Sequence, residues 1–469
     1  MNKKLIKASS FLLGVIMALL LVLVISANAA IDGISVPNTT TPMFNLTAKA
    51  DYISTAEGGS YLIWGFANGA GRAQYSAPTL IVNQGDTVTV NLTNELPLLN
   101  GLPVPVSIVF PGQSGVISNE VAPTTQDGPL TKEVLPGGSV SYTFTASQPG
   151  TYTYYSGTNP DLQIEMGLVG VLIVRPYGYV QGDPSTYKAY NHPDSQYRRE
   201  YLFFLSEMDP LIHQAVLFGW PIDTTTFWPV YWFINGRTAP DTMSMAFDPL
   251  LPTQPYNCMP ATHPGEKVLL RIVGGGRDSH PYHTHGNHVR VIARDGRLVS
   301  SGPGAGADLS KMEFTVTSAP GQTIDAVFVW TGEKMGWDIY GTETDAALTH
   351  SCNAKTVAEA QALRLTNPTD PYFSTQDAAT KEYCADHGKI FPVLLPEQQF
   401  LTFGPWYSGS PFLGAGGTLP PGEGGLNPNA GFFFMWHSHN ENEIVNNNIF
   451  PGGMLTMTVV EHPSVEIMD

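Results

Sequence analysis

Charged residues are scarce in this sequence. Only 13% of its 469 residues are charged, about half of the usual quarter for soluble domains. There is no long run of Lys or Arg, and the formal net charge is −17. Nucleic acid is therefore excluded as the main partner, because phosphate binding needs a basic face. Hydrophobic residues at 42% and aromatic residues at 11% are sufficient for a sizeable core, which excludes global disorder.

Cysteine is also scarce. The chain has three, Cys258, Cys352 and Cys384, and their spacing excludes a CxxC zinc ribbon. Three single disulfide pairings are open, each leaving one thiol over. We favour the pair Cys352–Cys384, which would cross-link one polar segment. We expect one structural disulfide or none.

Long apolar runs are absent except near the N-terminus. Lys3, Lys4 and Lys7 precede an apolar run at 11–25, which is followed by Ala27-Asn28-Ala29. The run is short for a bilayer crossing, and the pattern predicts a secretory signal peptide at 1–29, with an uncleaved anchor as the alternative. Cleavage would change the formal charge from −17 to −20, since this segment carries three lysines and no acid. We expect a secreted, periplasmic or extracellular protein with no membrane contact after cleavage.

Short alternating segments bounded by Gly, Pro and Asn recur along the chain and predict antiparallel β-structure. Thr87–Leu92 and Ser139–Phe144 are two such segments. The same pattern recurs later in the chain, where Pro-Gly turns precede 267–273 and 323–329. We predict an all-β chain with one sandwich at 35–180 and a second at 198–469, joined by a surface linker at 176–197. The surplus length of the second unit is placed in an insertion at 340–430.

Histidine is concentrated in two places. Four of the twelve histidines lie within residues 280–288, and two more form the pair His437-Ser438-His439. An H-x-H pair on a strand projects both imidazoles from one face, so two facing strands can offer four nitrogen donors to a metal. Imidazole suits copper, zinc, iron or nickel, with copper favoured on affinity.

These motifs resemble those of the multicopper oxidases. His280-Pro-Tyr-His283-Thr-His285-Gly resembles the family's HPxHxHG motif, and Trp436-His437-Ser438-His439 with Gly453-Met454 resembles its C-terminal HCH…GM motif. Residues 199–210 and 233–236 resemble the start of a second cupredoxin domain, and 79–96 resembles a strand of the first. The resemblance implies two cupredoxin-like Greek-key β-sandwiches, as in the two-domain laccases, which are trimers.

The departures from the family pattern are specific. The first-domain motifs HWHG and HSH are absent, and the resemblance places Val109, Pro111, Tyr155 and Gly157 at their four ligand positions. The blue-copper cysteine corresponds to Ser438, whose hydroxyl cannot replace a thiolate. The other blue-copper histidine corresponds to Glu443, so His280 and Met454 are what remains of that site.

Half of the family's trinuclear cluster remains. The resemblance implies that His283 occupies the type 2 position, and that His285, His437 and His439 occupy type 3 positions. We predict these four, with His280 nearby, as metal ligands for a mono- or dinuclear copper site, with zinc as the alternative. The four-electron reduction of dioxygen is not expected of this chain alone, and no catalytic residue is assigned. We expect His288 to be a supporting residue, and the isolated histidines, His192, His213, His263, His387 and His462, to lie at the surface.

Two functions from different classes follow. The first is an exported, multicopper-oxidase-like protein that binds copper and has a redox or copper-handling role, with enzymatic activity left open. The second is a non-catalytic cupredoxin scaffold for extracellular assembly or adhesion, in which the histidine pairs are relics. A third possibility combines these two functions: a different chain supplies the missing copper ligands. The expected partner is a metal ion or small molecule, and a homo-oligomer such as a trimer is open.

Overall fold

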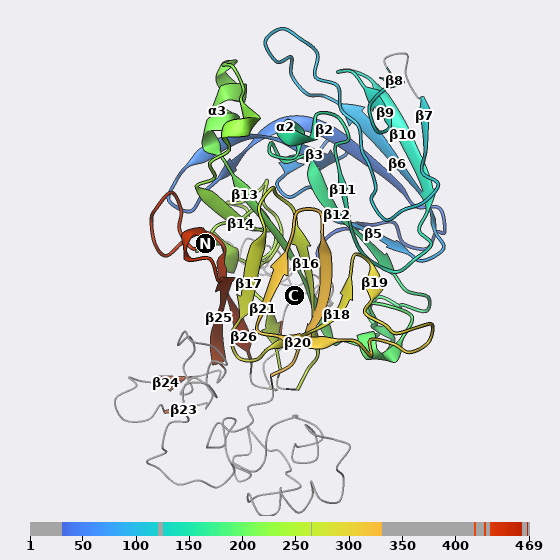
Figure 1. The fold of residues 1–469 in the computed structure, drawn as a ribbon, viewed down its shortest axis with the longest axis vertical. Coiled ribbons are helices and arrows are strands. Elements are labelled where there is room, and N and C mark those ends of the chain that lie inside the picture. The colour runs from blue at the N-terminus through green and yellow to red at the C-terminus, as the bar shows by residue number, and fades with distance from the viewer. Residues whose placement is uncertain are drawn as a thin grey trace, which may run out of the picture.

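The computed structural model describes residues 31–120, 125–263, 265–330, 417–418, 426–427, 432–461 and 467. These residues form mainly β-strands, arranged as two β-sandwiches (Figure 1). The predicted signal peptide, Cys352, Cys384 and most of the predicted insertion at 340–430 lie outside the described residues. The expected all-β fold class is confirmed.

The first sandwich has a four-stranded and a six-stranded sheet. The four-stranded sheet has the order β1-β5-β12-β11, with strands Ile34–Ser35, Leu80–Asn83, Val169–Arg175 and Gly150–Tyr155. The six-stranded sheet has the order β4-β3-β2-β6-β10-β7, with strands Ala73–Gln74, Ser60–Asn68, Met43–Ser54, Thr87–Asn94, Ser139–Thr145 and Ile117–Glu120. A separate hairpin pairs β8 (Thr125–Asp127) with β9 (Lys132–Val134).

The core of the first sandwich follows from period-two alternation. In β6, Val88, Val90 and Leu92 are buried, while Thr89 and Asn91 between them are partly exposed. The inward residues pack in one cluster with Leu80 and Leu172 of the other sheet. Burying one face of each sheet against the other is how a sandwich removes its apolar side chains from water.

The second sandwich carries the histidine motifs. Its seven-stranded sheet has the order β14-β13-β16-β22-β18-β19 with β20 paired to β18, and the strands are Tyr231–Ile234, Arg199–Met208, Val268–Gly274, Thr323–Phe328, Val289–Arg294, Arg297–Leu298 and Lys311–Glu313. Its five-stranded sheet has the order β15-β26-β25-β17-β21, with strands Ala261–Thr262, Leu455–Val460, Phe432–Ser438, His280–Thr284 and Thr315–Ser318. A two-stranded sheet pairs β23 (Gly417–Thr418) with β24 (Leu426–Asn427).

β16 is buried on both faces, which explains why its sequence is apolar apart from Arg271, rather than alternating. Val268, Leu270 and Ile272 point into the core of the second sandwich. Leu269 packs instead with residues of the segment between the sandwiches, and Val273 packs with residues of β12. A strand covered on both sides reads as an uninterrupted hydrophobic run rather than an alternating one.

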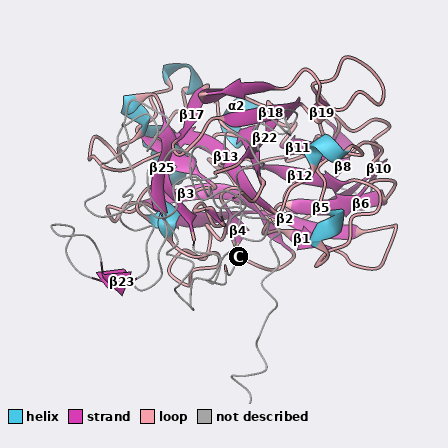
Figure 2. Ribbon diagram, turned by 90° about the horizontal axis from the view of Figure 1, so that it is seen from below, coloured by secondary structure: helices cyan, strands magenta, loops and turns pink. Residues whose placement is uncertain are grey.

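Helices are few and short in the described part of the chain (Figure 2). α3 (Pro210–Phe218) begins after Asp209, whose side chain accepts a hydrogen bond from the Leu211 amide, and it ends at Gly219 in the left-handed region. The remaining helical turns are α2, η1, η2, η3, η4 and η7, which span Pro160–Gln163, Pro184–Thr186, Pro193–Ser195, Thr224–Thr226, Asp241–Met243 and Glu441–Glu443. None of the described helices is long and apolar enough to span a membrane.

A buried ionic network joins the two sandwiches. Glu200 of β13 is hydrogen-bonded by Arg175 of β12 and by Arg271 of β16 (2.7 and 2.9 Å). Arg271 also donates to the Thr151 hydroxyl (2.7 Å), which donates in turn to Asp325 of β22 (2.7 Å). Because all of these side chains are buried, the charges depend on one another for solvation.

The connecting segment at 176–197 was expected to be a surface linker, but part of it is buried. Tyr187, Tyr190 and Tyr197 are buried in a cluster with strands of the second sandwich. Tyr190 donates a 2.6 Å hydrogen bond to Asp325, and Tyr197 accepts one from Arg175 at 2.9 Å. The segment therefore adds to the contact between the sandwiches.

Candidate metal centre

The two H-x-H motifs lie on neighbouring antiparallel strands. β17 pairs with β25, and the register places His283 opposite His437 and Tyr282 opposite Ser438. Directly opposed residues share a face of the sheet, whereas successive residues alternate faces. His283 and His437 therefore project from one face, and His285 and His439 follow at intervals of two.

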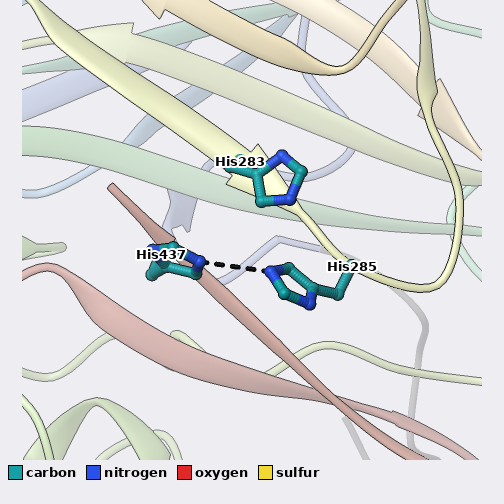
Figure 3. A group of neighbouring side chains, drawn as sticks. All are labelled: His283, His285 and His437. Carbon is teal, nitrogen blue, oxygen red and sulfur yellow. Dashed lines mark hydrogen bonds between the residues drawn. The ribbon is translucent and has the colours of Figure 1, made fainter. Parts of the chain in front are cut away.

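The four histidines on this face are close together. The potential ligand atoms of His283, His285 and His437 all lie within 4.8 Å of one another (Figure 3). The His439 ring centroid is 5.0 Å from that of His283 and 5.6 Å from that of His437. The structure thus brings together four of the five predicted ligands, with three of them buried and His439 half-buried.

Backbone carbonyls fix the ring orientations. The Nδ1 of His283 donates to the carbonyl of Phe314 (2.6 Å), and the Nδ1 of His437 donates to the carbonyl of Ser438 (2.6 Å). In each ring the lone pair is then left on Nε2. The Nε2 of His283 is buried with no hydrogen-bond partner, and the Nε2 of His437 lies 3.2 Å from the Nε2 of His285.

Burial favours the neutral form of His283 and His437. Burial lowers the pKa of His283 to about 4 against the opposing effect of its bond to Phe314, and the neighbouring His437 and His439 lower it further. Burial also lowers the pKa of His437. Neutral imidazoles are the form that coordinates a metal.

His280 lies on the other face of β17, apart from this group. Its Nε2 is 2.8 Å from Glu207 and its Nδ1 is 3.0 Å from Glu443, so both ring nitrogens are occupied by carboxylates. Burial alone would lower the pKa of His280, but the two carboxylates outweigh it and raise the pKa to about 9. His280 is therefore an imidazolium that donates two hydrogen bonds, not a lone-pair donor.

The rest of the blue-copper position is built into the same network. The Ser438 hydroxyl donates to Glu443 (2.6 Å), and the Asn440 amide donates to the other oxygen of Glu443 (3.0 Å). Met454 is buried in the apolar core of the second sandwich. Hydrogen bonds among protein groups thus fill the place that a thiolate and a second imidazole have in a blue-copper site.

Phe314 and His288 lie beside the cluster. The Phe314 ring centroid is 4.1 Å from that of His283, 5.9 Å from that of His439 and 5.5 Å from that of His288. His288 is half-buried, and burial lowers its pKa. Its ring contact is with Phe314, and a supporting role for His288 stays a prediction.

The expectation of a surface position is wrong for His213. Its side chain is only 1% exposed, and its Nδ1 donates to the carbonyl of Leu62 at 2.5 Å. Its Nε2 lies 3.6 Å from the buried Glu165. A single histidine in α3 gives no periodic signal that distinguishes this packed position from an exposed one. His387 and His462 lie outside the described residues.

The first sandwich offers no imidazole to the centre. Every histidine of the chain lies at or after His192. At the positions of the family's first-domain ligands, Val109 and Tyr155 exchange backbone hydrogen bonds of 2.9 and 3.2 Å. A Cβ on Gly157 would lie 2.8 Å from a methyl of Val109, so this position has no room for an imidazole without rearrangement.

Two residues that matter at the centre were missed in the sequence. Glu207 lies in β13 and contacts His280 from a strand distant in sequence, and Phe314 contributes a backbone carbonyl. A carboxylate within the apolar run of β13 is the one signal that could have singled out Glu207, because buried acids need a partner. The role of Phe314 could not be read from the sequence, because every residue has a backbone carbonyl.

The first sandwich is similar to a known family. Residues 66–178 match the family model described as multicopper oxidase. This part of the chain is similar to multicopper oxidases. The match lies on the sandwich that has no histidine, while the histidine cluster belongs to the other.

Curated multicopper oxidases are similar over less than a quarter of the chain. The iron transport multicopper oxidase fetC of Epichloe festucae is 38% identical over 104 residues, which cover 22% of this chain and 15% of that protein. The iron transport multicopper oxidase FET3 of Saccharomyces cerevisiae is 34% identical over 113 residues, which cover 23% and 16%. The chain thus aligns with less than a fifth of the length of these relatives.

Solved structures are similar over nearly the whole chain. The multicopper oxidase mgLAC matches with a TM-score of 0.51 and 17% identity, covering 92% of this chain and 88% of that one. The blue copper oxidase from Nitrosomonas europaea matches with a TM-score of 0.50 and 18% identity, covering 89% and 85%. At these identities the likeness shows the fold, which is that of cupredoxin-type multicopper oxidases.

Proposed function

We propose that this chain is an exported, multicopper-oxidase-like protein that binds copper through His283, His285, His437 and His439. Its role is redox chemistry at a reduced site, or copper handling, rather than that of a conventional laccase. The metal ion is its expected small partner.

One observation carries this proposal: three buried imidazoles converge, and one of their inward-facing nitrogens has no hydrogen-bond partner. The Nε2 of His283 is buried without a hydrogen-bond partner, and the ligand atoms of the three histidines lie within 4.8 Å. An unsatisfied buried nitrogen costs about 1–3 kcal/mol unless something binds it. An all-imidazole set fits copper, and it also fits zinc.

The residues of this chain would hold the ion and limit its chemistry. The carbonyls of Phe314 and Ser438 fix two imidazoles with Nε2 toward the group, as is usual for metal-binding histidines. Copper bound there would supply one-electron redox chemistry. The blue-copper route for electrons lacks its thiolate, because the Ser438 hydroxyl is committed to Glu443. We therefore expect the isolated protein to show no strong blue-copper absorption.

Metal analysis of the mature protein tests the proposal. After loading with copper or zinc and desalting, we expect bound metal in the wild type and its loss in His283→Ala and His437→Ala. His192→Ala is the matched control, because this half-buried histidine lies in the connecting segment and its Nδ1 accepts a hydrogen bond from the Asp194 amide. A wild-type protein that stays metal-free after loading with either ion would contradict the proposal.

A non-catalytic scaffold for extracellular assembly is the second candidate. Exposed apolar side chains gather on and after α3, where Phe218, Trp220 and Trp228 are 59, 52 and 74% exposed. Such exposure of aromatic side chains favours an interaction surface. Filaments or sheets in electron micrographs, without oxygen uptake in the presence of a reductant, would favour this candidate. A different chain that supplies the missing ligands would instead appear as copper binding that needs both proteins.

A further inference from the structure

A cavity lies where three parts of the chain meet. Its walls come from the first sandwich (Pro149 and Tyr152), from the connecting segment (Asn191 and His192) and from the second sandwich (within 295–306). Its volume is about 580 Å³. Small-molecule sites span roughly 300–1,000 Å³ and occur preferentially where domains meet. None of the described lining residues belongs to the histidine cluster, so the cavity is a separate candidate site.

The loop at 300–306 forms one wall of the cavity and is held in place, although it is rich in glycine. The Ser301 amide donates to Asp308 (2.8 Å), and the Ala307 amide donates to Asp194 of the connecting segment (3.0 Å). These bonds fix the loop to its own base and to a neighbouring segment. The wall is therefore formed before a ligand binds, and binding does not include the cost of ordering this loop.

Arg297 brings a cation without a partner to the cavity. Its guanidinium makes no hydrogen bond or ion pair with the residues that the structure describes. The carboxylate of Asp295, which also lines the cavity, accepts a hydrogen bond from the Thr323 amide (3.1 Å). Burial, with the charge of Asp325, raises the pKa of Tyr152 to about 12, and the charge of Arg297 opposes this rise. The guanidinium therefore lies near the Tyr152 ring and is available to an anion.

Two further polar groups of the cavity are open to a ligand. The Nδ1 of His192 accepts a hydrogen bond from the Asp194 amide (3.2 Å), so the proton of the neutral ring is on Nε2. The Nδ2 of Asn191 donates to Gln84 (2.8 Å), which leaves the Asn191 carbonyl oxygen as an acceptor. Neither this oxygen nor the Nε2 of His192 is hydrogen-bonded to another described residue. The cavity thus offers a donor and an acceptor, which hydroxyl groups can use, beside its cation.

We propose that the cavity binds a small hydroxylated organic acid, with its carboxylate on Arg297 and its hydroxyl groups on His192 and Asn191. A planar guanidinium matches a carboxylate in a bidentate pair. One guanidinium balances the single negative charge of a carboxylate, whereas a phosphate ester carries a charge of about −1.5 to −2 at neutral pH. The rings of Tyr152 and Pro149 offer apolar surface to the carbon skeleton. This inference does not depend on copper binding.

Calorimetric titration of the mature, metal-free protein tests the proposal, with glucuronate and glucose as matched probes. The two sugars share a ring, and glucuronate has a carboxylate where glucose has a hydroxymethyl group. We expect glucuronate to bind saturably with a Kd of about 1 mM or less. Glucose should bind at least about tenfold more weakly, because charge-assisted hydrogen bonds are stronger than neutral ones.

Three variants locate the site. Arg297→Gln should weaken glucuronate binding at least about tenfold and abolish the preference over glucose. Lys311→Gln, which removes an exposed cation of β20 outside the cavity, is the matched control and should leave the Kd unchanged. A Cβ at Gly302 would meet no atom within 4 Å, so the chain accommodates a side chain there that occupies part of the cavity. We expect Gly302→Phe to bind neither sugar.

The absence of saturable glucuronate binding by the wild type up to about 50 mM overturns the proposal. Equal Kd values for the wild type and Arg297→Gln overturn it as well, because the cation is then not the anchor of the ligand. Tighter binding of glucose 1-phosphate than of glucuronate would assign the cavity to phosphate esters and contradict the carboxylate. Because the protein is metal-free throughout, these outcomes are the same whether or not the histidine cluster binds copper.

Discussion

At the scale of single residues, His280 shows how a buried imidazole can be held by two carboxylates. Glu207 and Glu443 hold both of its nitrogens, and the three side chains are buried together. A buried imidazolium between two carboxylates is stable because each charge satisfies the others, and the removal of one leaves the rest unpaired. The position now contributes electrostatic stability instead of coordination.

This arrangement predicts a loss of stability at alkaline pH. The pKa of His280 is raised to about 9, so its stabilising contribution is complete below the unfolded pKa of about 6.5 and is lost as pH rises through 9. We expect up to about 3 kcal/mol of unfolding free energy from this source. Urea denaturation between pH 6 and pH 10 should show the decline in the wild type and a flatter profile in His280→Gln. Parallel profiles for the two proteins would contradict the assignment.

Restoring the thiolate alone should not restore a blue site. In Ser438→Cys the new sulfur would face Glu443, and the nitrogens of His280 would still be bonded to carboxylates. Blue copper needs two imidazoles and a thiolate. We expect no intense visible band after copper loading of Ser438→Cys, and a triple variant that also carries Glu443→His and Glu207→Gln is the comparison. An intense band from the single variant would show that His280 exchanges its partners readily.

At the scale of elements, the pairing of β17 with β25 brings the histidine cluster together. The register places His283 opposite His437. Trp436 holds the backbone of the neighbouring His285 by donating its indole N–H to the His285 carbonyl (2.9 Å). The Trp436 side chain is fully buried and packs against Phe203 and Phe328. One side chain therefore links the core of the sandwich to the position of His285.

Two substitutions separate these roles of Trp436. Trp436→Phe keeps most of the apolar volume and loses the hydrogen bond, so we expect a loss of about 1 kcal/mol. Trp436→Ala also leaves a cavity and should cost about 3–5 kcal/mol. Chemical denaturation monitored by circular dichroism measures both. Equal costs for the two variants would show that the hydrogen bond, not the packing, dominates.

The alternating strands could be predicted from the sequence, and the site only in part. Thr87–Leu92 and Ser139–Phe144 lie within β6 and β10, because one-sided burial forces a period of two. The H-x-H motifs also predicted which imidazoles share a face. The opposite orientation of His280 follows from the same period, yet its partner Glu207 is 73 residues away and only the tertiary fold brings it near.

At the scale of the whole molecule, the two sandwiches are joined by buried charges rather than by a flexible tether. Glu200 binds Arg175 of the first sandwich and Arg271 of the second. Burial alone would raise the pKa of Glu200, but the two guanidinium groups outweigh it and lower the pKa to about 2. The contribution of Glu200 to stability is present above the unfolded pKa and is lost only as pH falls through about 2.

Neutralising Glu200 should weaken the whole protein. Glu200→Gln leaves two buried guanidinium groups without their shared carboxylate, and we expect a loss of about 3–5 kcal/mol. Calorimetry should show a lower melting temperature or two separate transitions, since the contact between the sandwiches is weakened. Glu95→Gln is the control, because the bridge from Glu95 to Lys49 is exposed and should contribute less than about 1 kcal/mol. A Glu200→Gln protein as stable as this control would contradict the role of the network.

The central claim is that the second sandwich binds copper through half of a family cluster. The most direct test measures copper stoichiometry by mass spectrometry of metals and records an electron paramagnetic resonance spectrum of the same Cu²⁺-loaded protein. We expect one or two coppers per chain, nitrogen hyperfine structure from imidazoles, no blue-copper signal, and loss of the bound copper in His283→Ala and His437→Ala. A metal-free wild type, or a copper signal that persists in both variants, would contradict the account.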